Sequence, residues 1–479
     1  MLKNVILTGI GLALIGLMRL GFNAVALRGF GETLAGQLNV ALSLAVLLSL
    51  PANTAFGSTT VRFVGQALAQ GRRERAAWTY RVMAVATSTT ALVVAIAAVL
   101  ARDWIAAEQQ VSPVLVVEAA VIAVGYAFYL FFRSVLYAID RVATYALLEV
   151  VGGAIFFVSL GVLALAGAGA HLLLGFFAAY AAFCVASWWL TRRLFLLPCP
   201  VPERQSWGPL LSFSAIAAAG TAASLSVREL AVSATPHLAD LGGAAHLGLS
   251  MSLLAPLQMF PRMLRSVIFA RSATLDGAGR RGELSANITE ATHWLLIIVV
   301  PACGLLGIVG GPLIELMGGS ATPERLLVFR LLAVAALMEV MATPAANALP
   351  GAGYVKAPSY AALVALVVAG VVWMGAAPSL GLVGVALGIV ANAIIKGGVP
   401  VWFAWRELKA RPTRALGRVT VLLAITLSAL ALVTLWPEWL LVGVGYVIVV
   451  VPLLWAPLRE LWALVWRRVA SAWPLTKNG

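Results

Sequence analysis

Two arginines lie inside long apolar stretches and occupy matching places in the two halves of the chain. Arg19 lies within the apolar segment that starts near residue 4, and Arg228 lies 209 positions later. A cation at mid-bilayer costs about 2.5 to 3.5 kcal/mol on insertion scales, so it usually faces a cavity or a partner. Two such cations, together with Asn23, predict a site for one anionic group. Alternatively, Arg19 extends to the outer surface and Arg228 pairs with Glu229 or another acid.

Further charged residues extend this prediction. Arg262 and Arg265 are three positions apart, on one helical face near the inner end of a predicted span, where they would receive a phosphate from the inner leaflet. Lys396 also lies in an apolar segment, and we assign it to the same cavity. Glu339 and Glu118 are candidate coupling groups that would titrate during transport. The alternatives are that the cations extend to lipid headgroups and that Glu339 is a static partner of an arginine.

The remaining reactive side chains do not form a recognisable catalytic or metal site. Three cysteines and four histidines are scattered without the spacing of metal ligands, and the chain has no phosphate-binding glycine loop. We therefore expect no metal, no cofactor and no enzymatic activity. Any energy for transport would come from an ion gradient or from consumption of the substrate.

The composition requires these charges to be positioned by membrane helices. The chain is 62% hydrophobic and 11% charged, with a mean hydropathy of +0.97, which a water-soluble protein of 479 residues could not tolerate. The sequence predicts an all-α polytopic membrane protein. Windows of about 20 apolar residues give fourteen spans, near residues 4–26, 36–60, 79–101, 113–133, 145–166, 171–190, 209–232, 244–268, 291–317, 326–349, 358–376, 380–402, 418–436 and 438–457.

An internal repeat predicts how the spans are grouped. Gly71-Arg72-Arg73 is followed 208 positions later by Gly279-Arg280-Arg281, which agrees with the spacing of the two arginines. Six spans per half is an even number, so the halves would be parallel repeats on either side of a central cavity. We expect one lobe over 1–206, a second over 207–412, two additional spans over 413–457, and an interfacial amphipathic helix and tail over 458–479.

The basic residues predict the orientation. With the N-terminus in the cytoplasm, 21 Lys and Arg residues fall in inward segments and three fall outside, at Arg28, Arg102 and Arg325. Both termini are therefore expected to be cytoplasmic. The net charge of +14 is explained by this asymmetry, so nucleic acid is not an expected partner.

These residues resemble a known transporter family. Met18-Arg19-Leu20-Gly21-Phe22, then Arg28-Gly29-Phe30-Gly31 and Gly36, are similar to the start of the multidrug/oligosaccharidyl-lipid/polysaccharide (MOP) superfamily, and most similar to its polysaccharide (O-antigen, Wzx-type) flippases. The resemblance implies transfer of undecaprenyl-pyrophosphate-linked oligosaccharides across the bacterial inner membrane by alternating access. It implies an anionic lipid-linked oligosaccharide as substrate, contact with membrane lipid, and polysaccharide polymerase and chain-length proteins as partners.

Three alternatives remain open at this point. Lipid II flippases share the arginine in the first span, but this chain has Leu50-Pro51-Ala52-Asn53 where their second span is rich in basic and aromatic residues. Drug exporters of the superfamily typically carry an acid in the first span, where this chain has Arg19 and Asn23. An enzyme acting on lipid-linked sugars would need a larger outer loop than the connections here, which are about a dozen residues.

Overall fold

The protein is all-helical over the residues that the structure, a computed structural model, describes: 2–196, 207–354, 356–409, 416–435 and 439–472. Helices suit a lipid environment because they satisfy their backbone hydrogen bonds internally. The elements are α1 (Leu2–Ala69), α2 (Arg73–Leu100), α3 (Arg102–Gln109), α4 (Pro113–Ala138), α5 (Val142–Leu165), the 3-10 helix η1 (Gly169–His171), α6 (Leu174–Leu196), α7 (Trp207–Leu238), α8 (Leu241–Gly277), α9 (Arg281–Leu316), α10 (Pro323–Gly351), α11 (Lys356–Leu380), α12 (Leu382–Leu408), α13 (Leu416–Leu435) and α14 (Trp439–Ala472).

The predicted fold class is confirmed, since the chain is an all-helical, multi-span membrane protein. Nine segments in the described part of the chain are long and apolar enough to cross a membrane. One of them lies within α1, which contains the first two predicted spans as a single helical run. The run breaks at Gly31, whose φ of 84° and ψ of 170° are accessible to glycine without steric cost. The break folds the two arms of α1 back toward one another.

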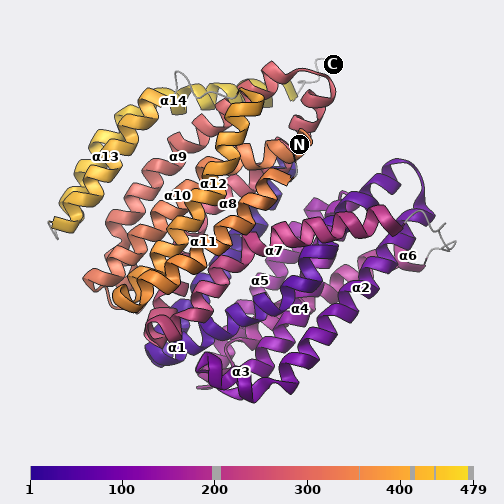
Figure 1. The fold of residues 1–479 in the computed structure, drawn as a ribbon, viewed down its shortest axis with the longest axis horizontal. Helices are drawn as coiled ribbons and strands as arrows, with labels where there is room; N and C mark the ends of the chain where they lie inside the picture. The colour runs from indigo at the N-terminus through magenta and orange to yellow at the C-terminus, as the bar shows by residue number, and fades with distance from the viewer. Residues whose placement is uncertain (1, 197–206, 355, 410–415, 436–438, 473–479) are drawn as a thin grey trace, which may run out of the picture.

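The helices form two bundles that lie side by side (Figure 1). In the first, which we call the N-bundle, α1 packs against α2, α4 and α5, and α6 packs against α4 and α5. In the second, the C-bundle, α10 packs against α8, α9 and α12, and α11 packs against α7 and α12. The bundles meet where α1 packs against α7 and α8. Helices α13 and α14 pack against α9 at the edge of the C-bundle.

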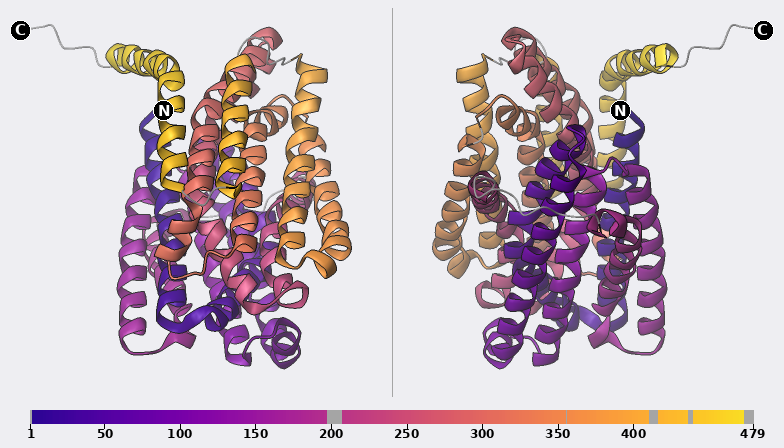
Figure 2. Two further views of the ribbon diagram at one scale, coloured as in Figure 1. Left: turned by 90° about the vertical axis from the view of Figure 1, so that its left-hand side faces the viewer. Right: turned by 90° about the vertical axis from the view of Figure 1, so that its right-hand side faces the viewer.

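The start of α1 and the end of α14 lie at the same end of the molecule, opposite the break in α1 (Figure 2). Helix α14 turns away from the bundle in its last part and contains Pro452 and Pro457, which remove helix hydrogen bonds and favour a bend. The amphipathic segment expected to start at residue 458 is therefore continuous with the last span up to Ala472. The tail beyond it, 473–479, lies outside the described residues.

Candidate functional site

Arg19 forms an ion pair that joins the two bundles. It lies on the first arm of α1, and its Nη2 is 3.3 Å from Oε1 of Glu229 on α7. The Arg19 side chain is 36% exposed and that of Glu229 is 13% exposed. A contact through a single nitrogen at this distance is weaker than a two-pronged arginine–carboxylate pair. The pair is thus an accessible tie between the bundles.

Arg228 belongs to a second charged cluster, which lies within the C-bundle. Its guanidinium donates to Gln258 on α8 and to Glu339 on α10. The other carboxylate oxygen of Glu339 is 3.4 Å from Nζ of Lys396 on α12, which also donates to the backbone oxygen of Ser224 at 3.2 Å. One carboxylate is therefore shared by two cations, and the cluster connects four helices near their midpoints.

The two clusters are neighbours because Arg228 and Glu229 are consecutive. Adjacent side chains on a helix of about 3.6 residues per turn diverge by roughly 100°, so α7 contacts α1 on one side and α10 and α12 on the other. Arg19, Arg228 and Lys396 supply three positive charges, and Glu229 and Glu339 supply two negative ones. One positive charge is left in excess. The arginines predicted to share one anion each hold a carboxylate of the protein.

Asn23 lies one helical turn from Arg19 in a buried polar network. Its amide nitrogen donates to Ser252 on α8 at 3.1 Å and to the backbone oxygen of Arg19 at 2.9 Å, and its oxygen accepts from Asn39 at 2.8 Å. Asn23 is only 2% exposed. It joins the two arms of α1 to α8, so its contacts are those of helix packing between the bundles.

The other predicted site residues take no part in the ion pairs of Arg19 and Arg228. Nε of Arg265 donates to Oδ1 of Asn347 at 2.8 Å, a neutral partner that leaves its charge uncompensated by this contact. The side chain of Arg262 is outside the described part of the structure. Glu118 is buried near the start of α4 and bonds to His171 in η1, while its Oε2 has no hydrogen-bond partner among the residues that the structure describes.

A small pocket inside the N-bundle was missed by sequence reasoning. It has a volume of about 40 Å³ and is lined by Arg19, Arg133, Glu149 and three tyrosines, among others. That volume holds about three to four waters at roughly 10 to 15 Å³ each. Tyr129 donates to Glu149 inside it. The available signal was a polar stripe on α4 at helical spacing, formed by Tyr126, Tyr129, Arg133 and Tyr137.

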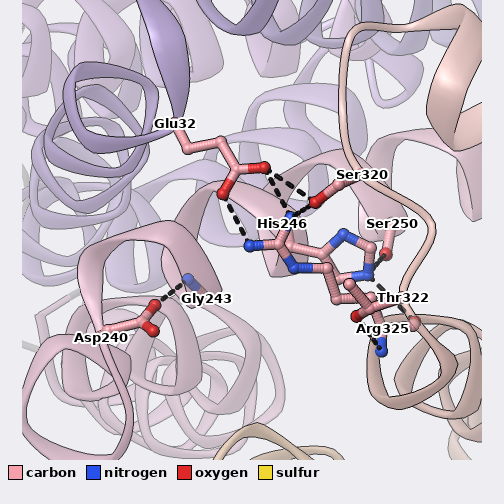
Figure 3. Close-up of polar contacts among 8 residues, drawn as sticks. All are labelled: Glu32, Asp240, Gly243, His246, Ser250, Ser320, Thr322 and Arg325. Atoms are coloured by element: carbon pink, nitrogen blue, oxygen red, sulfur yellow. Dashed lines mark hydrogen bonds and ion pairs between the residues drawn. The ribbon is translucent and has the colours of Figure 1, made fainter.

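A second set of contacts joins the bundles at the end where α1 bends, and we call it the rim (Figure 3). Both carboxylate oxygens of Glu32 lie 2.6 Å from separate guanidinium nitrogens of Arg325 at the start of α10. Ser320 donates to Glu32 at 3.1 Å. The ring of buried His246 is 3.0 Å from the backbone oxygen of Arg325 and 3.3 Å from Ser250. This two-pronged pair closes the rim between α1 and α10.

Helix α3 adds a third group of contacts between the bundles. Gln110, which caps α3, donates to the backbone oxygen of Pro236 on α7 at 3.3 Å, and Ser233 donates to Gln109. Glu108 is 3.9 Å from His237. The sequence did not predict this short helix, because it follows a span without a proline or glycine break.

Comparison with known proteins identifies the fold. No family model and no curated protein matches the chain. Among solved structures, lipid II flippase MurJ in an inward closed conformation matches with a TM-score of 0.68 and 13% identity, over 95% of this chain and 99% of that one.

Two further solved structures each align with 85% of this chain, over 95% of their own chain. A multidrug resistance MATE family transporter, facing inward, matches with a TM-score of 0.62 and 14% identity. A MOP superfamily transporter from Pyrococcus furiosus, described by the reverse polarity of its binding pocket, matches with a TM-score of 0.63 and 16% identity. These proteins are transporters, and the chain has the fold of the MOP superfamily.

Proposed function

We propose that this protein is a flippase for an anionic lipid-linked oligosaccharide, an undecaprenyl-pyrophosphate-linked polysaccharide repeat unit, and that it works by alternating access. The observation that supports this most is the excess positive charge of the two clusters around α7. Charged side chains inside a membrane bundle are costly, and they commonly mark a substrate pathway. A pyrophosphate is the part of such a substrate that complements arginine and lysine.

The sign of the charge argues against export of cationic drugs. A cluster with excess positive charge between low-dielectric walls attracts anions and repels cations. Arg265 adds a further cation, which donates to the neutral Asn347. In the proposed mechanism the polyprenyl tail stays in lipid, while the bundles rock to expose the charged groups first to the inner and then to the outer leaflet.

The proposed setting is the bacterial inner membrane with both termini in the cytoplasm. The rim of Glu32 and Arg325 would then face outward, and the conformation seen here would be closed on the outside. In this setting the protein would hand its substrate to a polysaccharide polymerase and chain-length proteins. No nucleic-acid partner is proposed, since the net charge reflects the orientation.

Transfer of lipid II is the second candidate function. It is favoured by the near-complete overlap of this chain with the MurJ structure. Both candidate substrates carry a polyprenyl pyrophosphate, so the charged groups around α7 suit either. They differ in the sugar and peptide attached to it.

The test is transfer across proteoliposome membranes that contain the purified protein. Three labelled lipids or solutes are compared in parallel: a polyprenyl-pyrophosphate oligosaccharide, lipid II, and an organic cation dye. We expect transfer of the oligosaccharide lipid, no transport of the dye, and much slower transfer in Arg19→Ala. Transfer of lipid II alone would favour the second candidate. Dye transport that depends on Glu339 would contradict both and identify a drug exporter.

A further inference from the structure

Two carboxylates form ion pairs with the cations that we propose bind the substrate. Glu229 holds Arg19, and Glu339 holds both Arg228 and Lys396. We infer that Glu229 and Glu339 are internal counter-ions that an anionic substrate displaces, and that displacement of Glu229 releases the tie between the bundles. This inference rests on the proposed function. It adds which protein groups pair with the cations when no substrate is bound.

The geometry of the Arg19 pair favours exchange. The pair is formed through one guanidinium nitrogen at 3.3 Å, and the Arg19 side chain remains 36% exposed. At the rim, by contrast, Arg325 holds Glu32 through two nitrogens, each at 2.6 Å. A phosphate offers Arg19 a higher charge than a carboxylate and several oxygens for two-pronged binding. The substrate can therefore replace Glu229 more readily than it could replace Glu32.

The second cluster allows exchange without leaving a carboxylate unpaired. Removal of one partner from a buried ion pair is strongly unfavourable because the remaining charge has no counter-ion. Glu339 has two cationic partners, and its oxygens contact them separately. When a phosphate binds Arg228, Glu339 keeps Lys396, which is itself positioned by the backbone oxygen of Ser224. Lys396 thus stabilises the displaced carboxylate.

Displacement of Glu229 has a mechanical consequence, because its partner lies in the other bundle. Arg19 is on α1 and Glu229 is on α7, near the buried hydrogen bond from Asn23 to Ser252 that also joins the bundles. A ligand shifts a conformational equilibrium only through different affinities for the two states. An anion that binds Arg19 more tightly when Glu229 has moved away favours the state in which the bundles separate.

Binding of a short anionic probe tests the inference. Farnesyl pyrophosphate is titrated into the purified full-length protein in lipid nanodiscs, with wild type, Glu229→Gln, Glu339→Gln and Arg19→Gln compared. Glutamine keeps the shape of glutamate and removes the competing charge. We expect about five- to tenfold tighter binding for both glutamate variants, within the usual range of coupling between sites. Arg19→Gln should bind more weakly than wild type.

A matched control separates exchange from a general change in charge. Glu315→Gln removes a carboxylate from the exposed end of α9 and should leave the affinity unchanged. Thermal melting of each variant verifies folding. If folded Glu229→Gln and Glu339→Gln bind no more tightly than wild type, while Arg19→Gln still binds more weakly, the inference is wrong and the proposed function stands. Absence of binding to wild type and to every variant contradicts both.

The accessibility of Ser252 gives an independent readout of the mechanical step. In a background without native cysteines, Ser252→Cys lies at the buried contact between α8 and Asn23. Its reaction with a membrane-impermeant maleimide should accelerate when the probe is added. In combination with Glu229→Gln it should be fast without the probe. If neither the probe nor Glu229→Gln changes the rate of the maleimide reaction, Glu229 does not tie the bundles together.

Discussion

The guanidinium of Arg19 pairs with Glu229 and also lines the pocket of the N-bundle. Its charge and its shape therefore contribute separately to flipping. We expect Arg19→Ala to reduce flipping about tenfold to a hundredfold, the effect of losing a charged hydrogen bond worth about 1.5 to 3 kcal/mol. Arg19→Lys keeps the charge and should retain part of the activity. Initial rates of transfer in proteoliposomes measure both variants.

The control for this prediction is an arginine outside the charged clusters. Arg102 at the start of α3 is half exposed and, within the described part of the chain, forms an ion pair with its neighbour Asp103. Its substitution by alanine should change the rate by less than about fivefold, since exposed ion pairs contribute roughly 0 to 1 kcal/mol. Equal losses in Arg19→Ala and Arg102→Ala would show that charge at position 19 has no specific role.

The buried pocket of the N-bundle yields a second prediction at this scale. Tyr129→Phe removes the hydroxyl that donates to Glu149 and leaves a buried carboxylate with one donor fewer. We expect a loss of about 1 to 3 kcal/mol in stability, as for other buried polar groups that lose a partner. Thermal melting in nanodiscs measures it. Tyr360→Phe is the matched control, because Tyr360 on α11 is 63% exposed; an equal decrease there would contradict the assignment.

Sequence reasoning found the charged residues and offered, as an alternative, that Glu339 pairs with an arginine, but it could not say which arginine. A charged residue within an apolar segment can be recognised from the sequence alone, as Arg19, Arg228 and Lys396 were. Pairing Arg19 with Glu229 and Arg228 with Glu339 requires knowing which helices face one another, and spacing along one helix does not determine that. The link between Glu149 and Tyr129 likewise depends on the packing of α4 against α5.

At the scale of the element, close contact between α1 and α8 depends on a residue without a side chain. A Cβ atom at Gly36 would lie 2.0 Å from the backbone oxygen of Leu241, which is far below van der Waals contact and involves backbone that cannot rotate away. Gly36→Ala should therefore disfavour the closed rim. We expect a lower melting temperature and a slower rate of flipping than in wild type.

The control for Gly36 comes from the same helical run. Apart from its own helix, a Cβ atom at Gly29 would meet no atom of the described residues within 4 Å, so Gly29→Ala should leave both melting temperature and flipping rate near wild type. Because alanine favours helix in both places, the comparison isolates the steric effect. A wild-type melting temperature and flipping rate for Gly36→Ala would contradict the close approach of α1 and α8.

The helices themselves were largely predictable, and the links between them were not. Apolar windows of membrane length located the spans because lipid imposes that length on a helix. The same windows could not show that α1 stays helical to either side of Gly31, or that α14 continues past Pro457. They also missed α3, since a short polar helix at a membrane surface has no hydropathy signal.

At the scale of the whole molecule, and apart from the group around α3, contacts between the bundles lie either well inside the helices or at the rim. The ion pair of Arg19 and Glu229 and the network around Asn23 lie well inside the helices. The pair of Glu32 and Arg325 lies at the rim, where α1 bends. Rocking of the bundles requires both kinds of contact to break in one state and re-form in the other. A covalent bond in place of the rim pair would hold the protein in the state seen here.

A reversible cross-link across the rim tests whether the bundles separate there. In a background without native cysteines, Glu32→Cys and Arg325→Cys are combined and joined by a short, reducible bifunctional thiol reagent. We expect the reagent to abolish flipping and a reducing agent to restore it, because alternating access requires the rim to open. Each single variant, treated in the same way, gives the baseline for loss of the ion pair itself.

A matched pair within one element controls for the chemistry of the reagent. Arg280 and Glu283 form an exposed ion pair three residues apart at the start of α9, so a cross-link between cysteines there constrains one helix and does not join the bundles. That cross-link should leave flipping intact. If the rim cross-link also leaves flipping intact, the two bundles do not separate at Glu32 during transport. In that case the substrate must leave by a path that does not pass between α1 and α10.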